Sequence, residues 1–347
     1  MFLQGQDPTL DTAGGNRDKS PIERHKMFAI QVLALGGPQV LQYQQVAEPT
    51  AGDDQILVRS EAIGVNFIDT YYRRGTYVTD LPFIPGDEGA GTVIGLGSKV
   101  QRFSLGDKVV WSSPHGSYTE VVAVPASAAV RIPEGVSSRD AASVFSQGLT
   151  AHYLSHSTYP IQQGDTVLIH AGAGGVGLLL TQMAVQRGAR VITTVSSDAK
   201  ERVSRQAGAR HVLRYEDDIA AQVRGLTDGE GAAAVYDGVG ASTFDASLAS
   251  LRPRGTLALF GAASGPVPPM DPQKLNAAGS LYLTRPTIGD YLRTPQELAW
   301  RAADVFEGVA NGSLKATVGA EYPLRDAAKA HEDLESRSTI GSLLLLP

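Results

Sequence analysis

A run of glycines gives the first indication of chemistry in this chain. The segment Ala171–Gly177 reads AGAGGVG and fills the pattern GxGxxG. It follows Thr166–His170, whose apolar centre predicts a buried strand, and precedes Leu178–Arg187, whose spacing predicts a helix. Alone the pattern is weak in a chain with 38 glycines, but between a strand and a helix it is typical of a dinucleotide-binding turn. The other interpretation is a glycine-rich turn with no ligand.

Each glycine of the pattern has a distinct physical role in such a turn. Gly172 permits the tight turn, Gly174 lets the backbone approach a pyrophosphate, and Gly177 allows the helix to pack closely on the strand. Gly175 and Val176 lie at the start of the helix, where free N–H groups and the positive end of the helix dipole favour an anion. We therefore predict that this loop and the start of the helix form the binding site for the pyrophosphate of a dinucleotide.

The residues after the next strand indicate which dinucleotide binds. An NAD site has Asp or Glu at the end of that strand, about 20 residues after the glycines, to bind the ribose 2′-hydroxyl. Here Val191–Val195 is followed by Ser196, Ser197, Asp198 and, one turn later, Lys200. Serine and lysine would bind a 2′-phosphate, and Asp198 lies past the strand end, where an acid favours the helix dipole. We predict NADPH; the other interpretation of Lys200 is a solvated helix charge.

The composition excludes several classes of protein. The chain has 347 residues, 42% of them hydrophobic, which predicts a folded protein with two domains or one elaborated domain. Its formal net charge of −6 argues against nucleic acid as the main partner, because a dedicated binder needs a basic surface. The absence of cysteine excludes disulfides and a thiol nucleophile, and is compatible with a reducing compartment.

The N-terminal residues, Met1–Lys26, are polar and of mixed charge, and we predict a disordered extension there. Met27 begins the first apolar-periodic stretch and is a second candidate for the start of translation. The N-terminus lacks the apolar core of a signal peptide. No run approaches the roughly 18 apolar residues that indicate a membrane span. We expect a cytoplasmic protein.

The pattern of predicted secondary structure in the rest of the chain changes near residue 138. From Met27 to about Val130 it reads as short strands with turns, and afterwards strands and helices alternate, which indicates βαβ units and a parallel sheet. We predict an α/β fold in which a Rossmann-type, doubly wound domain, residues 148–288, is inserted into a mostly β substrate domain. That second domain comprises residues 27–147 and 289–347. A ligand is expected in the crevice between the two.

Several segments resemble one known family, in the right order along the chain. They are Gly64–Tyr77 (GVNFIDTYYRRGTY), Gly148–Tyr153, the glycine loop, Tyr236–Gly240 (YDGVG), Leu281–Pro286 (LYLTRP) and His331–Leu346. From Met27 onward the chain resembles the quinone oxidoreductase (zeta-crystallin-like) branch of the medium-chain dehydrogenase/reductase superfamily. The resemblance implies a GroES-like β domain around the Rossmann domain, a homodimer, NADPH, and reduction of quinones.

The resemblance also implies roles for individual residues. Near the nicotinamide it places Asn66, Asp69 and Tyr71 in the cleft, with Tyr77 at the quinone pocket. On the cofactor side it places Tyr153, with Thr287 near the nicotinamide ring. At the nicotinamide ribose it places Val239, Phe260 and Gly261. At the pyrophosphate it places Gly174, Gly175 and Val176. At the 2′-phosphate it places Ser196 and Lys200, with Tyr215 nearby and Arg337 as a second cation. The tyrosines could instead be core aromatics with one polar tip, Asp69 a helix or turn cap, and Arg337 a surface charge.

The zinc-dependent relatives carry a Gly-His-Glu motif and cysteine ligands, and this chain lacks both. Its corresponding residues are Gly86, Asp87 and Glu88, and there is no cysteine, so we predict no metal site. His152 and His156 have helical spacing but lack the glutamate of HExxH, and are read as structural. Glu88 is read as a possible buried turn partner.

A quinone suits a site without a Lewis acid, because hydride addition gives a hydroquinone anion with a delocalised charge. Positioning by Asn66, Tyr71 and Tyr77 could suffice, without an obligatory acid or base. The alternatives are an NADPH-dependent reductase of activated C=C bonds in enones or enoyl thioesters, and a non-enzymatic crystallin-like or RNA-binding role. For the homodimer, an edge strand at Ser280–Thr284 is a candidate pairing surface.

Overall fold

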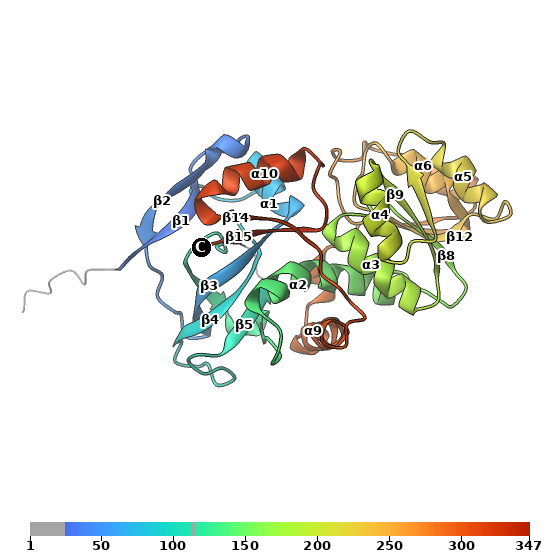
Figure 1. The fold of residues 1–347 in the computed structure, drawn as a ribbon. Helices are drawn as coiled ribbons and strands as arrows, with labels where there is room; N and C mark the ends of the chain where they lie inside the picture. The colour runs from blue at the N-terminus through green and yellow to red at the C-terminus, as the bar shows by residue number, and fades with distance from the viewer. Residues whose placement is uncertain (1–24, 113–114) are drawn as a thin grey trace, which may run out of the picture.

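The computed structural model describes residues 25–112 and 115–347. Residues 1–24 of the predicted N-terminal extension lie outside this range, and Lys26 is already the first residue of a strand. Figure 1 shows two lobes, one with the first strands and the chain's C-terminus, the other with the middle of the chain. Within the described ranges, no helix combines the length and apolar character that crossing a bilayer requires.

The first lobe is built on a mostly antiparallel seven-stranded sheet. Its path is β14 (Val318–Pro323), β15 (Ser342–Leu346), β3 (Gln55–Val65), β4 (Glu88–Leu96), β5 (Lys108–Ser112) and β7 (Ala129–Arg131), and β6 (Val121–Pro125) pairs with β3. A hairpin of β1 (Lys26–Val32) and β2 (Leu41–Ala47) lies beside it. The last strand, β15, pairs antiparallel with β3, so residues near the C-terminus and residues of the first third of the chain belong to the same sheet. This lobe is therefore discontinuous in sequence.

The second lobe contains a parallel sheet of six strands. They are β8 (Thr166–Ile169), β9 (Arg190–Val195), β10 (His211–Arg214), β11 (Ala232–Asp237), β12 (Leu251–Leu259) and β13 (Tyr282–Thr284). Their spatial order is β10-β9-β8-β11-β12-β13, and each neighbouring pair is parallel. This is the doubly wound order in which the direction of winding reverses between β8 and β11. A dinucleotide is expected at the carboxyl ends of these strands, at that reversal.

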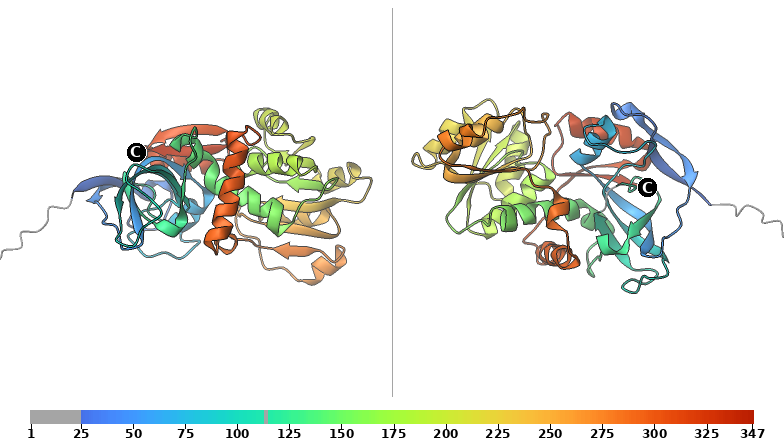
Figure 2. Two further views of the ribbon diagram at one scale, coloured as in Figure 1. Left: turned by 90° about the horizontal axis from the view of Figure 1, so that it is seen from below. Right: turned by 180° about the vertical axis from the view of Figure 1, so that it is seen from behind.

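Helices connect these strands and join the lobes. They are α1 (Phe67–Arg74), α2 (Ser138–Tyr153), α3 (Gly175–Gln186), α4 (Asp198–Gln206), α5 (Ile219–Gly225), α6 (Phe244–Ala249), α7 (Gln273–Ala277), α8 (Ile288–Tyr291), α9 (Pro295–Ala310) and α10 (Ala327–Glu335). Figure 2 shows α9 across the junction between the lobes, and it packs on α2.

Helix α2 belongs to both lobes. It begins at a cap in which the Ser137 side chain accepts the N–H of Asp140, and its buried face contacts β3, β4 and β5 as well as α3. The boundary that we propose between residues 147 and 148 falls inside this continuous helix. A rigid helix shared in this way fixes the orientation of one lobe against the other.

Candidate active site

A cleft of about 700 Å³ lies between the lobes. One wall is α1 with the turn that follows it. The other wall is the segment after β12, residues 261–267, with Leu283 and Arg285 at the end of β13. Glu335 and Arg337, from the end of α10 and the segment after it, close one end. The cleft therefore collects residues from four distant parts of the sequence.

Helix α1 carries the predicted tyrosine into this cleft. The carboxylate of Asp69 accepts the N–H of Asn66 at 2.8 Å and so caps the first turn, and Gly75 ends the helix with a left-handed φ of +80°. Tyr71 then lines the cleft, and its hydroxyl accepts the N–H of Ala262 from the opposite lobe at 3.0 Å. Burial raises the pKa of Tyr71. Its own hydroxyl proton stays available for an acceptor.

Tyr77 extends the aromatic wall that Tyr71 begins. Its ring packs edge-on against Tyr71 and against Tyr72, in each case with ring centroids 5.5 Å apart. Tyr77 lines the cleft and is 37% exposed. Of the three residues predicted to position a quinone, Tyr71 and Tyr77 thus stand side by side on one wall, and Asn66 is not among the cleft-lining residues.

Asp69 takes a different place from the one that the resemblance implied. It is 1% exposed, and its carboxylate accepts the hydroxyl of Tyr118 at 2.9 Å as well as the N–H of Asn66. Burial, aided by the nearby charge of Asp87, raises its pKa well above the usual range. One oxygen of its carboxylate thus accepts both bonds within the first lobe, and Asp69 is not among the cleft-lining residues, so the alternative of a helix cap describes it.

Asn66 belongs to a buried polar network beside the glycine loop. Its amide nitrogen donates to Glu88 at 2.7 Å, and its amide oxygen accepts from Gln147 at 3.3 Å. Gln147 in turn accepts the hydroxyl of Ser342, and a Cβ added at Gly175 would lie 2.4 Å from its amide oxygen. The network therefore orients Asn66 from β4 and from α2, and through Gln147 from the C-terminal strand.

Glu88 is the acid of this network and is fully buried. It accepts the N–H of Ser146 at 2.9 Å, and Gly64 leaves the space it fills, since a Cβ there would lie 2.0 Å from its carboxylate. Burial raises its pKa to about 7, and the hydrogen bonds from Asn66 and Ser146 act in the opposite direction. Near neutral pH this group is poised between its two protonation states.

We expect Glu88 to make the stability of the fold depend on pH. Its folded-state pKa lies above the ordinary 4.5, so the folded chain binds the proton more tightly than the unfolded chain. Its contribution is present below pH 4.5 and is lost as the pH rises toward 7, by about 3 kcal/mol in all. Urea unfolding of the wild type and Glu88→Gln between pH 5 and 8 measures it. A difference between the two proteins that stays constant over this range would exclude this role.

The glycine loop has the shape that a pyrophosphate requires. A Cβ on Gly174 would meet only the carbonyl of Ala171, at 3.4 Å, so the outer face of the loop is open. No side chain caps the N-terminus of α3, which leaves its first N–H groups for an anion. Gly177 packs as predicted, because a Cβ there would lie 2.3 Å from the Ala171 carbonyl.

Gly172 acts differently from its predicted role in this loop. The left-handed residue of the turn is Ala171, with φ +53°, and not Gly172. Gly172 is needed for packing instead, because a Cβ there would lie 2.4 Å from the Cβ of Thr193 on β9. The hydroxyl of Tyr215 accepts the N–H of Ala171 at 2.9 Å, which braces the start of the loop.

The predicted 2′-phosphate residues come together beyond the end of β9. The ammonium group of Lys200 donates to the hydroxyl of Ser196 at 3.3 Å and to the backbone carbonyl of Arg337. Ser197 caps α4 through a hydrogen bond from the backbone N–H of Lys200 at 3.4 Å. Burial and the positive charge of Arg337 lower the pKa of Lys200. Two cations, Lys200 and Arg337, thus lie together with Ser196 at a site that we call the phosphate corner. No carboxylate of the described residues lies within 4.0 Å of either cation.

Asp198 is an acid next to the predicted 2′-phosphate residues, where its negative charge would oppose NADPH binding, but it pairs with an arginine. Its carboxylate lies 2.6 Å from Arg214, which also pairs with Glu201 at 2.6 Å. The side chain of Asp198 is 91% exposed. Its charge is therefore directed to Arg214 and to solvent, and the phosphate corner stays positive.

The remaining predicted residues lie along the ends of β11 and β12 and around α8. Asp237 organises the first group: its carboxylate accepts the N–H of Val239 at 2.8 Å, and its carbonyl accepts the N–H groups of Phe260 and Gly261. Tyr153 is buried and stacks on Tyr291 with centroids 4.4 Å apart. The exposed Thr287 precedes α8. Of these residues, the cleft lining includes Gly261.

Comparison with known proteins identifies the family to which this chain belongs. A model described as zinc-binding dehydrogenase matches residues 175–303, and one described as alcohol dehydrogenase GroES-like domain matches residues 52–134. A quinone oxidoreductase of Pseudomonas aeruginosa is 43% identical over 321 residues, covering 92% of this chain and 99% of that protein. This chain belongs to the quinone oxidoreductase branch of the medium-chain dehydrogenase/reductase superfamily.

Two further relatives show the range of this branch. A mycobacterial protein solved in complex with NADPH is 55% identical, with a TM-score of 0.91, covering 92% of this chain and 100% of that chain. A 2-haloacrylate reductase of a Burkholderia species is 38% identical, covering 92% of this chain and 99% of that protein. The predicted fold, a GroES-like β domain with an inserted Rossmann-type domain, is confirmed.

In this quinone oxidoreductase relative the positions of zinc ligands serve other purposes. The carboxylate of Asp87 accepts the backbone N–H of His115 at 3.0 Å and lies 3.5 Å from its ring. Within residues 25–112 and 115–347, no group of three or more His, Asp or Glu side chains is arranged to hold a metal ion.

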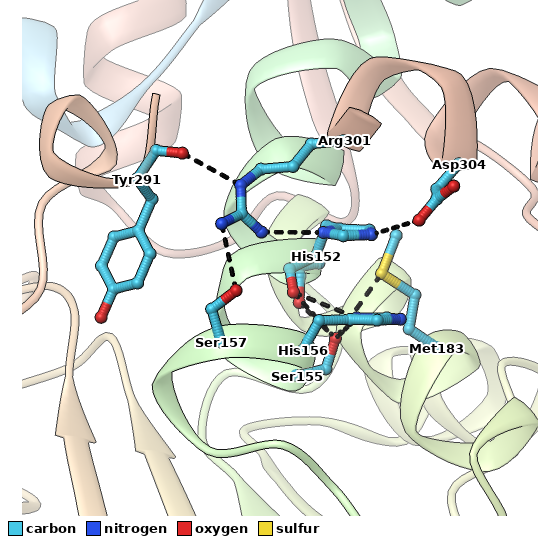
Figure 3. A network of polar contacts seen from close by, with 9 residues as sticks. His152, Ser155, His156, Ser157, Met183, Tyr291, Arg301 and Asp304 are labelled. Atoms are coloured by element: carbon cyan, nitrogen blue, oxygen red, sulfur yellow. Dashed lines mark hydrogen bonds and ion pairs between the residues drawn. The ribbon is translucent and has the colours of Figure 1, made fainter. Parts of the chain in front are cut away.

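The paired histidines of α2 lie in a network that joins α2 to α9 (Figure 3). His152 accepts from the guanidinium of Arg301 at 3.1 Å and donates to Asp304 at 2.8 Å, while its ring stacks on His156 at 4.0 Å. Burial lowers the pKa of His156 to about 4. The network links the helices that join the two lobes, as a structural reading of both histidines implies.

The sequence reasoning missed three residues of the site. Gln147 orients Asn66, Asp237 organises the loop after β11, and Arg285 lines the cleft. Asp237 and Arg285 lie inside segments that carried the family resemblance, so these segments were the available signal. Gln147 had none, because nothing local distinguishes it from another polar residue of an amphipathic helix.

Proposed function

We propose that this chain is an NADPH-dependent quinone reductase that works without zinc. The observation that carries the proposal is the pair of binding features at the two ends of the interlobe cleft. Lys200, Ser196 and Arg337 form a positive corner suited to a 2′-phosphate, and Tyr71 and Tyr77 form an aromatic wall suited to a flat ring. The glycine loop between β8 and α3 offers N–H groups for the pyrophosphate. The names of the relatives and the NADPH bound by one of them support this reading.

The residues of the cleft would bind and orient the reactants. NADPH, when bound, supplies the hydride. Tyr71 has a hydroxyl proton free to donate to an acceptor oxygen, because its own oxygen accepts the N–H of Ala262. Asn66 is held by Glu88 and Gln147, which leaves one amide proton for a ligand. With a delocalised product anion, such positioning needs no side chain as general acid, and water supplies the final proton.

Our proposal also covers the location, the domain boundaries and the oligomeric state of the protein. We propose a cytoplasmic enzyme of two domains with the boundaries given above. For the homodimer we propose pairing at β13, since this strand ends the parallel sheet and its Tyr282 is 63% exposed. Size-exclusion chromatography with light scattering tests it, with Leu283→Pro expected to give a monomer.

A second candidate is the reduction of activated C=C bonds, which the 2-haloacrylate reductase among the relatives favours. Both reactions deliver hydride to a conjugated acceptor, so the cofactor corner does not distinguish them. A crystallin-like or RNA-binding role has only the family resemblance in its favour, and the charge of −6 opposes it.

We expect the purified enzyme to oxidise NADPH with 1,4-naphthoquinone at a kcat/KM at least about tenfold above that for an enone such as cyclohexenone. The flat quinone matches the aromatic wall, and its reduced product needs no Lewis acid. Rates at 340 nm for each acceptor, with NADPH and then with NADH, measure this. A faster rate with the enone would favour the second candidate, and no oxidation with any quinone would refute the first.

A further inference from the structure

One cation of the cleft has almost no partner. Arg285 follows β13 and precedes the buried Pro286, and its guanidinium lines the cleft. It donates to the hydroxyl of Tyr77 and to the carbonyl of Pro286, each at 3.4 Å, which is the outer limit of a hydrogen bond. A guanidinium has five N–H donors, so most of its capacity is unused.

The other arginines of the cleft have partners or assigned roles of their own. Arg74 pairs with Glu335 at 3.0 Å. Arg337 donates to the carbonyl of Ala263 at 3.2 Å and stands with Lys200 at the phosphate corner. Unlike Arg74, Arg285 has no carboxylate oxygen within 4.0 Å in the part of the chain that the structure describes, and unlike Arg337 it does not stand at the predicted 2′-phosphate site. Its positive charge is therefore balanced by nothing but solvent.

The cleft around this charge has an aromatic and apolar wall, beside the polar Thr70, Thr76 and Ser264 and the Arg74–Glu335 pair. The nearby lining includes Phe67, Tyr71, Tyr77, Pro266, Val267 and Leu283. Burial raises the pKa of Tyr71 and of Tyr153, and the charge of Arg285 acts against that rise at both hydroxyls. Arg285 thus stands close to the groups assigned to the nicotinamide and quinone end of the cleft. An aromatic wall beside a guanidinium that has no carboxylate partner suits a flat ring that carries one negative oxygen group.

We propose that Arg285 determines the acceptor preference of this enzyme, in favour of quinones that carry an anionic oxygen substituent beside the ring. This proposal rests on the proposed function, because it names the substrate class of the same cleft. A sulfonate or carboxylate on the ring would pair with the guanidinium while the ring lies against Tyr71 and Tyr77. Arg285 is then a specificity-determining residue, separate from those that hold the cofactor.

The first experiment compares 1,2-naphthoquinone-4-sulfonate with uncharged 1,2-naphthoquinone under NADPH. In Arg285→Gln, the kcat/KM for the sulfonate is expected to fall about 10- to 100-fold, with less than about threefold change for the uncharged quinone. Arg285→Lys should retain part of the preference. The matched control is Arg190→Gln, an exposed arginine at the first residue of β9 that is not among the cleft-lining residues. In each protein the kcat/KM for the sulfonate is divided by that for the uncharged quinone. Comparing this ratio between variant and wild type cancels the difference in intrinsic reactivity between the two acceptors.

The second experiment needs no turnover. Naphthalene-2-sulfonate, which cannot be reduced by hydride, is titrated calorimetrically into each protein with saturating NADP⁺. Its dissociation constant should rise about tenfold or more in Arg285→Gln, stay unchanged in Arg190→Gln, and rise with salt in the wild type.

The outcomes separate the two proposals. If no quinone is reduced but naphthalene-2-sulfonate binding depends on Arg285, the proposed function fails and the anion site stands. If quinones are reduced while Arg285→Gln leaves the acceptor ratio and the sulfonate affinity unchanged, the role of Arg285 is refuted and the reductase stands. An equal loss for both acceptors also refutes charge selection. NADPH affinity and thermal unfolding, unchanged in Arg285→Gln, show that the variant is folded.

Discussion

Replacing both Lys200 and Arg337 with alanine is expected to weaken NADPH binding on the order of 1000-fold while changing NADH affinity by a few-fold at most. The two cations share the corner beyond β9, and the carboxylates of the described residues stay more than 4.0 Å from them. A 2′-phosphate would supply the missing negative charge. A charge-assisted hydrogen bond contributes about 1.5–3 kcal/mol, so two such bonds account for this factor.

The measurement is fluorescence titration of each variant with NADPH and with NADH. NADH lacks the 2′-phosphate and serves as the internal control. Arg202→Ala is the matched protein control, since Arg202 is an exposed cation on the same helix, two residues further along. Lys200 also donates to the backbone of Arg337, so Lys200→Arg tests whether the charge or this contact matters. An equal loss of affinity for NADPH and NADH would overturn the phosphate assignment.

The Rossmann-type half of the fold could be predicted because its signals are local. Each parallel strand is a short apolar run, each helix has its own periodicity, and the glycine loop lies between one of each. The position of Lys200 just beyond β9 followed from the same logic, because the sheet order fixes where this strand ends. These features depend on residues close together in the sequence.

Helix α1 and the network behind it could not be predicted in the same way. The segment Phe67–Arg74 lies in a region of strands, and its helix depends on a short capping interaction between Asn66 and Asp69. Arg73 is fully buried, although an arginine in a sequence is normally expected at the surface. Its partners, His331 and Glu335, are more than 250 residues away. No local pattern carries such information.

Arg73→Met is expected to lower the free energy of unfolding by about 3–5 kcal/mol, because it leaves buried partners unpaired. The guanidinium of Arg73 bonds Glu335 at 2.6 Å, the Nδ1 atom of His331 at 2.8 Å and the carbonyl of Gly36 at 3.1 Å. An arginine can only donate, so His331 accepts at Nδ1 and carries its proton on Nε2. Burial and the charge of Arg73 lower the pKa of His331 to about 3, which keeps it neutral.

From His331 the chain of hydrogen bonds continues to the cap of α1. The Nε2–H of His331 donates to the Tyr118 hydroxyl at 3.0 Å, and Tyr118 donates to Asp69 at 2.9 Å. Arg73 thereby ties α1, which carries Tyr71, to α10, which leads to Arg337. Its loss should loosen the two ends of the cleft together.

Urea unfolding of Arg73→Met measures the effect, and Arg74→Gln is the matched control. Arg74 pairs with the same Glu335 at 3.0 Å, but its side chain is 54% exposed, so its loss should cost less than about 1 kcal/mol. Because Glu335 is common to both pairs, the difference between the variants reports the burial of Arg73 together with its bonds to His331 and Gly36. Equal costs for the two arginines would show that Arg73 is no more than another surface ion pair. A larger cost for Arg73, with weaker NADPH binding in the folded variant, would show that the same buried cation stabilises the fold and aligns the cleft.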